Sequence, residues 1–519
     1  MAHKTMTRAS LPRPEPSRRS AGLMRMALVA LAVAAQVGII IFLVSVLQDR
    51  ALVLYFAFQV IAVIDIFVLA GKRQNTSFTM AWVLLILLLP VTGHLLYVLW
   101  GRRGKHRRMR RTLARSADYL EKDPVTYQEF GEDHPRRKRL AGYLGRMGFP
   151  LYERTSCTYY PLGDDQFPAM IADIRRARRF VFLEYFIIAD GDLWKEVREA
   201  LVEKAAEGVE VRVMYDDLGS LVSLPEGMDE DLKAHGIDVL SFNPIHYSTS
   251  RLYINYRNHQ KICVIDGEVA YTGGTNLADE YVNYYDKHGH WKDTAIRLAG
   301  DAVWSMTVFF LQMWEAQTKE EQQYHCYRGQ GESPDAKGFY QPFIDGPMNN
   351  PDNPAETMYR SMIYNAREYV YISSPYVIID NSMADALCTA ALGGTDVRIV
   401  TTHIWDRWFV HMATQSSYAS LLRAGVRIYE YAPGMIHSKT IISDDDHCIT
   451  GTFNMDYRSF YLHYENGVYI CGAPVVEEIR TDFLETFDKC REIELDRWTK
   501  RPLYMKAMQG FFRIFAIFL

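Results

Sequence analysis

Two stretches of this chain carry the same residues at the same offsets, and this repetition limits the possible folds more than any other feature. In each stretch a histidine is followed by a lysine at two, an aspartate at seven, a glycine at fourteen and an asparagine at seventeen positions. The two copies are His259, Lys261, Asp266, Gly273 and Asn276, and His437, Lys439, Asp444, Gly451 and Asn454. Such a repeat predicts two similar lobes.

The segments before each copy also repeat in kind. Each half contains a β-rich run, an amphipathic helix, a second β-rich run, a short helix and a third strand, at 177–185, 193–207, 209–215, 229–234 and 237–241, and at 366–374, 383–392, 396–400, 418–423 and 426–431. Strands that alternate with helices are typical of βαβ units. We therefore predict an α/β fold of two βαβ lobes, related by a pseudo-twofold axis and built on mainly parallel sheets.

Composition divides the chain into six segments. A polar, helical stretch precedes the first lobe, and a stretch rich in Gly, Pro, Asp and Asn separates the lobes. The expected segments are a membrane region at 1–101, a juxtamembrane linker at 102–148, a first lobe at 149–318, a connector at 319–354, a second lobe at 355–495 and a C-terminal segment at 496–519.

Three apolar stretches occupy the first hundred residues, at Met26 to Leu47, Ala51 to Ala70 and Met80 to Trp100. Each is long enough to cross a hydrocarbon core of about 30 Å, which predicts N-terminal transmembrane helices. A cleaved signal peptide is the alternative for the first stretch, but its end lacks a small-residue cleavage site. Lys and Arg cluster before the first stretch and after the third, so three full crossings conflict with the orientation rule. Pro90 and Gly93 predict a broken third segment.

Charge and cysteine content narrow the function classes further. The formal net charge of −4 gives no global field for nucleic acid, and seven scattered cysteines suggest free thiols in a reducing compartment. The segment 496–519 mixes aromatic and basic residues, which suits an interfacial helix, although a helix packed on the core is the alternative.

The repeated motif suits chemistry at a phosphodiester. Side chains alternate along a strand, so each histidine and its lysine face one side, and two lobes can direct two imidazoles and two ammonium groups into one cleft. One histidine would attack phosphorus and the other would protonate the leaving group. The predicted phosphate donors are Lys261, Lys439, Asn276 and Asn454. Nothing in the sequence requires a metal or another cofactor.

Each imidazole needs a carboxylate that orients it. Aligning the strands after each motif matches residues 291–296 with 463–468, which predicts Asp293 as the partner of His259 and Glu465 as the partner of His437. Exposed strand carboxylates are the alternative. Asp266 differs, because its odd offset and the following glycine predict a hairpin turn and a structural role.

Several other residues are weaker candidates. Loop histidines His288 and His290 lie near Asp293, and three aromatic residues suit a lipid entry path or ordinary packing: Tyr185, Tyr376 and Trp405.

The paired motif resembles that of the phospholipase D superfamily over residues 150 to 490. Residues 82–93 and the closing 497–502 are similar to bacterial cardiolipin synthases within it. The family signature counts the motif aspartates, Asp266 and Asp444, in its catalytic set. Gly274 and Thr452 depart from the serine that is common there.

The resemblance implies a cardiolipin synthase. His259 would take a phosphatidyl group from one phosphatidylglycerol, with loss of glycerol, and a second phosphatidylglycerol would accept it; His437 would act as acid and then base. The residues alone leave the order of the histidines open. A hydrolase, a transferase that uses phosphatidylethanolamine or CDP-diacylglycerol, and a non-enzymatic scaffold are the alternatives. The expected partners are membrane lipids and no nucleic acid, with homo-oligomerisation left open. The expected location is a bacterial inner membrane, as a multi-pass protein with cytoplasmic lobes.

Overall fold

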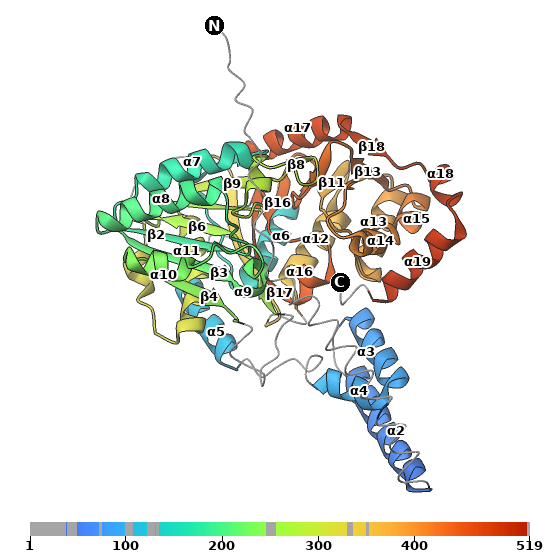
Figure 1. Ribbon diagram of the computed structural model, residues 1–519. Helices are drawn as coiled ribbons and strands as arrows, with labels where there is room; N and C mark the ends of the chain where they lie inside the picture. Colours follow the sequence, from blue (N-terminus) through green and yellow to red (C-terminus); the bar gives the residue numbers. More distant parts are fainter. Residues whose placement is uncertain are drawn as a thin grey trace.

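The computed structural model describes residues 38, 49–71, 75–98, 107–121, 130, 134–244, 256–329, 336–348 and 352–515 of the 519 residues. These residues form two α/β lobes that lie side by side, and a group of N-terminal helices projects from one side of the body (Figure 1).

The first lobe is built on a seven-stranded sheet. Its order is β1 (Thr155–Tyr160), β9 (Ala295–Gly300), β7 (Val269–Gly273), β6 (Ile262–Ile265), β2 (Phe180–Tyr185), β3 (Glu210–Asp216) and β4 (Asp238–Phe242). Every residue of β2 is buried: Val181 and Leu183 lie in a cluster with α7 (Gly163–Arg175) and α8 (Asp192–Ala206), whereas Phe180 and Phe182 lie in the cluster that contains α11 (Val303–Thr318). Helices therefore cover both faces, as a strand that is apolar on both sides requires.

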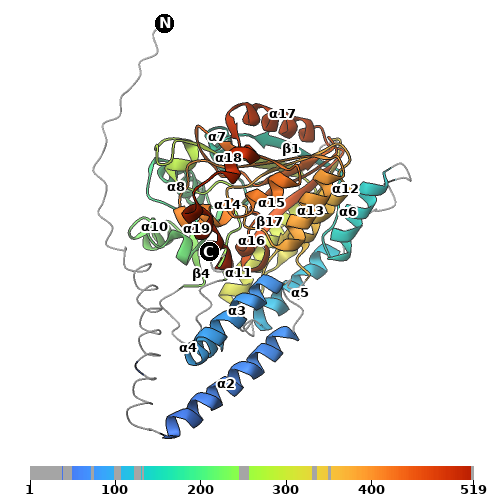
Figure 2. The same cartoon turned by 90° about the vertical axis from the view of Figure 1, so that its right-hand side faces the viewer.

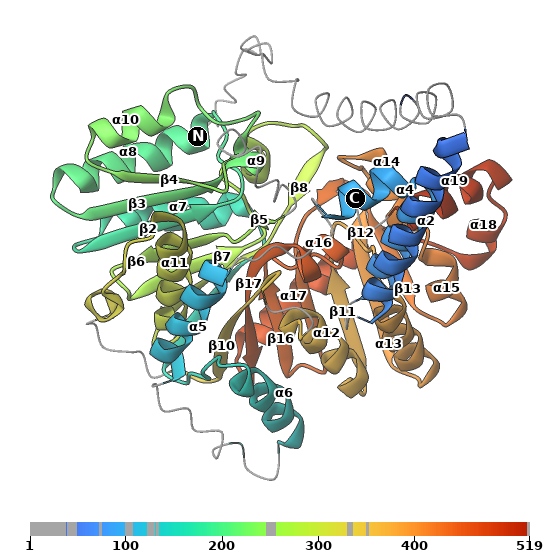
Figure 3. The same ribbon diagram turned by 90° about the horizontal axis from the view of Figure 1, so that it is seen from below.

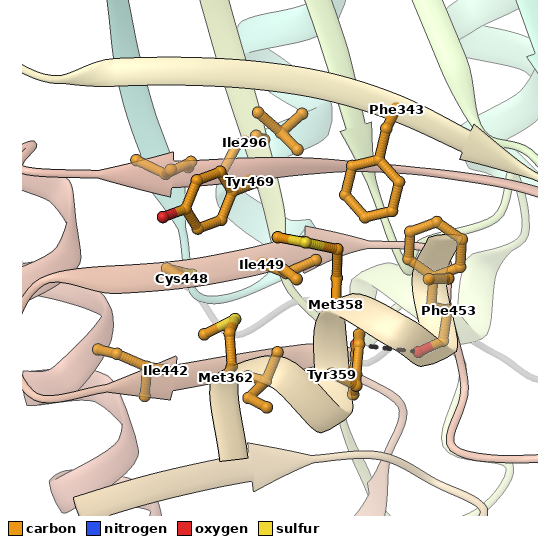
Figure 4. Close-up of a cluster of buried hydrophobic side chains, with 14 of the residues drawn as sticks. Ile296, Phe343, Met358, Tyr359, Met362, Ile442, Cys448, Ile449, Phe453 and Tyr469 are labelled. Carbon is orange, nitrogen blue, oxygen red and sulfur yellow. Dashed lines mark hydrogen bonds between the residues drawn. The ribbon is translucent and has the colours of Figure 1, made fainter. Parts of the chain in front are cut away.

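The second lobe repeats this plan. Its sheet runs β10 (Phe339–Asp345), β17 (His463–Cys471), β16 (His447–Gly451), β15 (Thr440–Ser443), β11 (Tyr369–Ser373), β12 (Asp396–Thr402), β13 (Arg427–Tyr431) and β18 (Cys490–Glu492). Met358 and Met362 of α12 (Pro354–Asn365) pack on this sheet, and Ile296 of the first lobe lies in the same cluster (Figure 4). One apolar core thus joins the lobes.

Both sheets are mixed, so the prediction of mainly parallel sheets is wrong. Parallel pairing occurs where helices connect the strands, in β2–β3–β4 and β11–β12–β13. The hairpins β6–β7 and β15–β16 are antiparallel because a connection of a few residues cannot return the chain in the same direction. The segment 319–354, predicted to connect the lobes, also contributes β10 to the second sheet.

Two short strands cross from one lobe to the other. β5 (Arg257–Asn258), directly before the first motif, pairs in parallel with β17. β14 (Gly434–Ile436), directly before the second motif, pairs in parallel with β8 (His290–Lys292). Each motif histidine is therefore delivered to an edge of the opposite lobe.

The N-terminal helices are α2 (Asp49–Ala70), α3 (Thr76–Leu88) and α4 (Pro90–Leu96). Within the described ranges, none of the helices combines the length and the apolarity that a membrane crossing needs; apart from one residue, the stretch Met26 to Leu47 lies outside those ranges. The break predicted at Pro90 is present between α3 and α4. Figure 2 shows α2 extending beneath the body, and the start of α3 packs on the second lobe through Phe78 and Ala81.

Further helices flank the lobes. The linker contains α5 (Arg107–Glu121), which runs along α11, and α6 (Pro135–Arg146). The C-terminal segment forms α18 (Leu495–Thr499) and α19 (Leu503–Ile514). Phe512 of α19 packs against Trp408 of α14 (Trp408–Gln415), on the side of the second lobe where the N-terminal helices also lie (Figure 3).

Candidate active site

The crossing strands bring the two motif histidines to one boundary between the lobes. The backbone N–H of His259 donates to the carbonyl of Tyr464 at 2.9 Å, and that of His437 donates to the carbonyl of Lys292 at 2.7 Å. Both partners belong to the opposite lobe. The site therefore requires both halves of the chain.

Each histidine is paired with a carboxylate of the other lobe. Nδ1 of His259 lies 2.8 Å from Oε2 of Glu465, and Nδ1 of His437 lies 2.5 Å from Oδ2 of Asp293. The sequence identified these carboxylates but paired them within each repeat, and that pairing is wrong. An alignment of repeats compares positions within a lobe and contains no information on the contacts that cross between lobes. With Nδ1 facing a carboxylate, Nε2 of each ring is left for the substrate.

The two carboxylates are held differently. Glu465 accepts hydrogen bonds from the hydroxyls of Thr452 and, at 2.8 Å, Ser459. Oδ1 of Asp293 accepts from the backbone N–H of Thr294 at 2.9 Å, and a Cβ placed on Gly274 would lie 2.0 Å from the same oxygen. Thr452 and Gly274 are the two positions where serine is common in the family. One supplies a hydroxyl to its carboxylate, whereas the other has no room for a side chain.

Both motif lysines are buried beside the histidines. Nζ of Lys261 donates to the carbonyl of His259 at 2.8 Å. Nζ of Lys439 donates to the carbonyl of His437 and lies 2.7 Å from its Nδ1. Burial lowers the pKa of Lys261 to about 7 and that of Lys439 to about 8, while neighbouring carboxylates oppose the shift. The ammonium groups are therefore positioned for a phosphate but hold their protons weakly before it binds.

Burial and the lysine charges also act on the imidazoles. Burial, with the charges of Lys261 and Lys439, lowers the pKa of His259 well below its usual range. Burial and Lys439 lower the pKa of His437 to about 4, against the opposing charge of Asp293. Both rings are thus neutral near pH 7, which suits a nucleophile. The negative charge of a bound phosphodiester favours protonation of the ring that acts as acid.

The motif aspartates lie in the turns of the two hairpins. Asp266, at φ +56°, accepts from the backbone N–H groups of Arg178, Arg179 and Phe180 at 2.7–2.9 Å. Asp444, at φ +53°, accepts from three consecutive N–H groups, starting at Arg367, at 2.9–3.2 Å. These carboxylates anchor each hairpin to the start of its central strand. They contact backbone amides rather than the histidines, which supports a structural role.

The motif asparagines follow β7 and β16. Oδ1 of Asn276 accepts from the N–H of Ile187 at 3.1 Å, and its Nδ2 donates to Tyr281 at 2.8 Å, so one amide hydrogen remains for a substrate oxygen. The backbone N–H of Asn454 donates to Ser459 at 3.1 Å.

The weaker candidates are spread over several environments. Tyr185 is buried, and its hydroxyl lies 3.5 Å from the sulfur of Met170. Nδ1 of His290 lies 3.0 Å from the hydroxyl of Tyr431, and Tyr376 donates to Asp406 at 2.7 Å. Trp405 and His288 are at least partly exposed.

Sequence reasoning missed the aromatic neighbours of the histidines. The ring of His259 lies 4.9 Å from Phe186 and 5.6 Å from His463, measured between centroids. The ring of His437 lies 5.3 Å from Tyr281 and 5.5 Å from Trp291. The alignment that identified the carboxylates already matched Trp291 with His463, so it held a signal for both residues.

The chain is similar to several known proteins. The sequence matches the family model "Cardiolipin synthase, PLD-like domain" at residues 170–291 and 359–487, and "Phospholipase_D-nuclease N-terminal" at residues 57–102. Cardiolipin synthase 2 of Bacillus anthracis is 33% identical over 455 residues, which cover 86% of this chain and 87% of that protein. A cardiolipin synthase of Geobacillus thermodenitrificans is 31% identical over 461 residues, 87% of this chain and 90% of that protein.

A solved structure shares the fold. The phosphatidylserine synthase of Haemophilus influenzae Rd KW20 superimposes with a TM-score of 0.56 at 13% identity, over 74% of this chain and all of that one. Two α/β lobes that each bring a histidine and a lysine to their common boundary, and that each match the PLD-like domain model, define a phospholipase D-like protein. Within that class, the chain belongs to the cardiolipin synthase family.

Proposed function

We propose that this protein is a cardiolipin synthase that uses phosphatidylglycerol as donor and acceptor. Nε2 of His259 attacks the donor phosphorus while His437 delivers a proton to the departing glycerol oxygen, leaving a phosphatidyl group on His259. His437 then takes the proton from a hydroxyl of a second phosphatidylglycerol, whose oxygen attacks the same phosphorus. The products are cardiolipin, free His259 and, from the first step, glycerol.

One observation carries the proposal: each histidine contacts a carboxylate of the opposite lobe, and the charges of His437 and of the two buried lysines all act on the imidazole of His259. Charge that develops on the phosphoryl oxygens would be stabilised by Lys261 and Lys439, with Asn276 and Asn454 as further donors. Glu465 and Asp293 would orient the two rings and support the positive charge that each ring gains in turn.

The molecule offers reasons to place this chemistry at a membrane. Exposed apolar side chains gather on α19, including Leu503, Tyr504 and Phe511, next to basic residues. Such a helix suits the headgroup region of a bilayer. We propose a multi-pass N-terminal anchor in a bacterial inner membrane, with the lobes on its cytoplasmic face. A surface crowded with lipid headgroups lets a lipid hydroxyl compete with water for the covalent intermediate.

Product analysis tests the transferase against a hydrolase with the same residues. We expect headgroup- and chain-labelled phosphatidylglycerol, supplied in detergent micelles, to give cardiolipin and free glycerol in equal amounts. Phosphatidic acid as the only lipid product would assign the protein to hydrolysis instead.

Trapping the intermediate tests the role of His259. Acid-free quenching during turnover and peptide mass spectrometry should find the phosphatidyl group on the peptide that contains His259. The same preparation of His259→Ala, checked for folding by circular dichroism, should carry no adduct. A scaffold would keep its cellular function in His259→Ala and His437→Ala, whereas we expect both variants to lose cardiolipin formation.

A further inference from the structure

The half-site around His259 contains a second imidazole, His463, that the proposed reaction does not use. Nδ1 of His463 lies 3.7 Å from Oε1 of Glu465, which is longer than a hydrogen bond. Nine-tenths of its side chain is buried, and within the described part of the chain neither ring nitrogen has a hydrogen-bond partner. Buried polar groups are nearly always paired, so this ring requires an explanation.

The neighbours of His463 suggest what it binds. His259, His463 and Glu465 each offer one ligand atom, and these three atoms lie within 4.8 Å of one another. Two imidazoles and a carboxylate form a donor set that suits Zn²⁺ and related transition-metal ions, whereas Mg²⁺ and Ca²⁺ prefer oxygen ligands. We infer that these three residues form a site for a divalent transition-metal ion, represented by Zn²⁺, that inhibits the enzyme.

Inhibition follows whichever nitrogen of His259 binds the ion. If Nε2 is the ligand, the lone pair that should attack phosphorus is occupied. If Nδ1 is the ligand, the ring proton must move to Nε2, which again leaves no lone pair for attack, and the contact with Glu465 is lost. Metal binding rests on the donor set alone, whereas inhibition also rests on the proposed role of His259.

The other half-site lacks this donor set. Trp291 occupies the position that corresponds to His463, and the imidazole that β8 does carry, His290, contacts the hydroxyl of Tyr431 at 3.0 Å instead. The charged groups that face the metal site act in opposite directions: Glu465 favours a cation, and Lys261 and Lys439 oppose it. Binding is therefore expected to be weaker than at a dedicated structural zinc centre.

Zinc titration of the full-length protein tests the site. Detergent-solubilised protein, freed of metals by chelation, should bind one Zn²⁺ per chain in equilibrium dialysis and lose transfer activity as the site fills. The same concentration of Mg²⁺ controls for divalent binding to the anionic lipid and should not inhibit. His463→Phe keeps a ring beside Phe186 but removes the ligand, and His463→Asn serves if that variant folds poorly.

The expected result is at least a ~10-fold higher zinc concentration for half-inhibition in the His463 variants, because loss of even an outer partner of a metal ligand costs ~10–100-fold in affinity. His403→Asn, which removes a half-exposed imidazole paired with Glu430, should titrate like the unmodified protein. Equal zinc sensitivity of the His463 variants, or no zinc bound by the unmodified protein, would overturn the site. Zinc binding that depends on His463 in a protein without any transfer activity would support the site and reject the proposed function.

Discussion

The half-sites around His259 and His437 share a plan and differ in the support of their carboxylates. Each ring presents Nδ1 to a carboxylate from the other lobe. Glu465, opposite His259, accepts hydrogen bonds from two hydroxyls. Asp293, opposite His437, accepts one from the backbone N–H of Thr294, and Gly274 packs directly against it.

This difference suggests how two copies of one motif can take different roles. A carboxylate that accepts several hydrogen bonds is stabilised as an anion and holds its ring in a fixed orientation, which suits a nucleophile. A carboxylate with fewer donors shares its charge with fewer groups, so that charge acts more fully on its histidine, which suits an acid and base. Among the charges around His437, that of Asp293 opposes the fall in pKa.

Replacement of the histidines should have the largest effect on activity and should separate the roles of the two half-sites most clearly. His259→Ala should abolish transfer from every donor, because no covalent intermediate forms. His437→Ala should lose about 10²–10⁴-fold with phosphatidylglycerol, the usual contribution of a general acid, but should still form the adduct from a phosphatidyl nitrophenol, whose leaving group needs no proton. Adduct mass spectrometry and initial rates distinguish the variants. Adduct formation in His259→Ala and none in His437→Ala would reverse the roles.

Replacement of the carboxylates tests the exchanged pairing. Glu465→Gln and Asp293→Asn should each lower kcat, by up to about 10⁴-fold, as when an orienting aspartate is made neutral in a triad. If Asp293 serves His437, only Asp293→Asn should recover rate with the nitrophenyl donor. Recovery in Glu465→Gln instead would favour pairing within each repeat. Glu477→Gln on the exposed face of α17 (Val475–Asp488) is the matched control.

The lysines predict a loss of activity in alkaline solution. A lysine is charged below its pKa, so Lys261, at about 7, and Lys439, at about 8, lose their charge as pH rises through that window. We expect kcat/KM of the free enzyme to fall between pH 7 and 9, by about tenfold per unit once a required proton is lost. Lys261→Arg, with a far higher pKa, should move the fall to higher pH. An unchanged profile in that variant would show that Lys261 does not set the limit.

Substitutions at Gly274 and Thr452, the two positions where serine is common in the family, should lower activity for different reasons. Gly274→Ala places a Cβ against Asp293 and should displace it from His437, whereas Thr452→Val removes the hydroxyl that donates to Glu465 and that accepts from the backbone N–H of Asn466 at 3.0 Å. The loss of one hydrogen bond to a charged group is worth about 1.5–3 kcal/mol, so Thr452→Val should lower kcat by about 10- to 100-fold. Thr452→Ser should retain most activity. Steady-state rates measure the effects of these substitutions. Equal effects of Thr452→Ser and Thr452→Val would show that the hydroxyl of Thr452 does not contribute to activity.

The residues explain why some features could be predicted and others could not. Offsets within a repeat follow local structure, so they located both motifs, the two carboxylates and the turn at Asp266. The pairing of Glu465 with His259 depends on β5 lying beside β17, and no local pattern records which strands meet across the lobes. The antiparallel pairing in each sheet could not be predicted for the same reason. His463 was not identified because the matching residue in the other repeat is a tryptophan.

The two hairpin turns give the smallest expected effect on chemistry. Asp266 accepts from three backbone amides and Asp444 accepts from three more and from Arg136. Asp266→Asn removes the negative charge that its three backbone amide donors stabilise, and it should lower the free energy of unfolding by about 1–3 kcal/mol. Denaturant unfolding measures this, with Asp385→Asn on the exposed face of α13 (Asn381–Leu392) as the control.

The same turns also separate support of the fold from participation in the reaction. The pKa of Asp444 is lowered by its amide donors and Arg136 despite burial. Because its folded pKa lies below its unfolded value, its contribution to stability is present above the unfolded pKa and is lost as pH falls through the folded one.

Activity per folded molecule of Asp266→Asn should match the unmodified protein, since the carboxylate contacts no reacting group. A variant of normal stability without turnover would instead place Asp266 in the reaction.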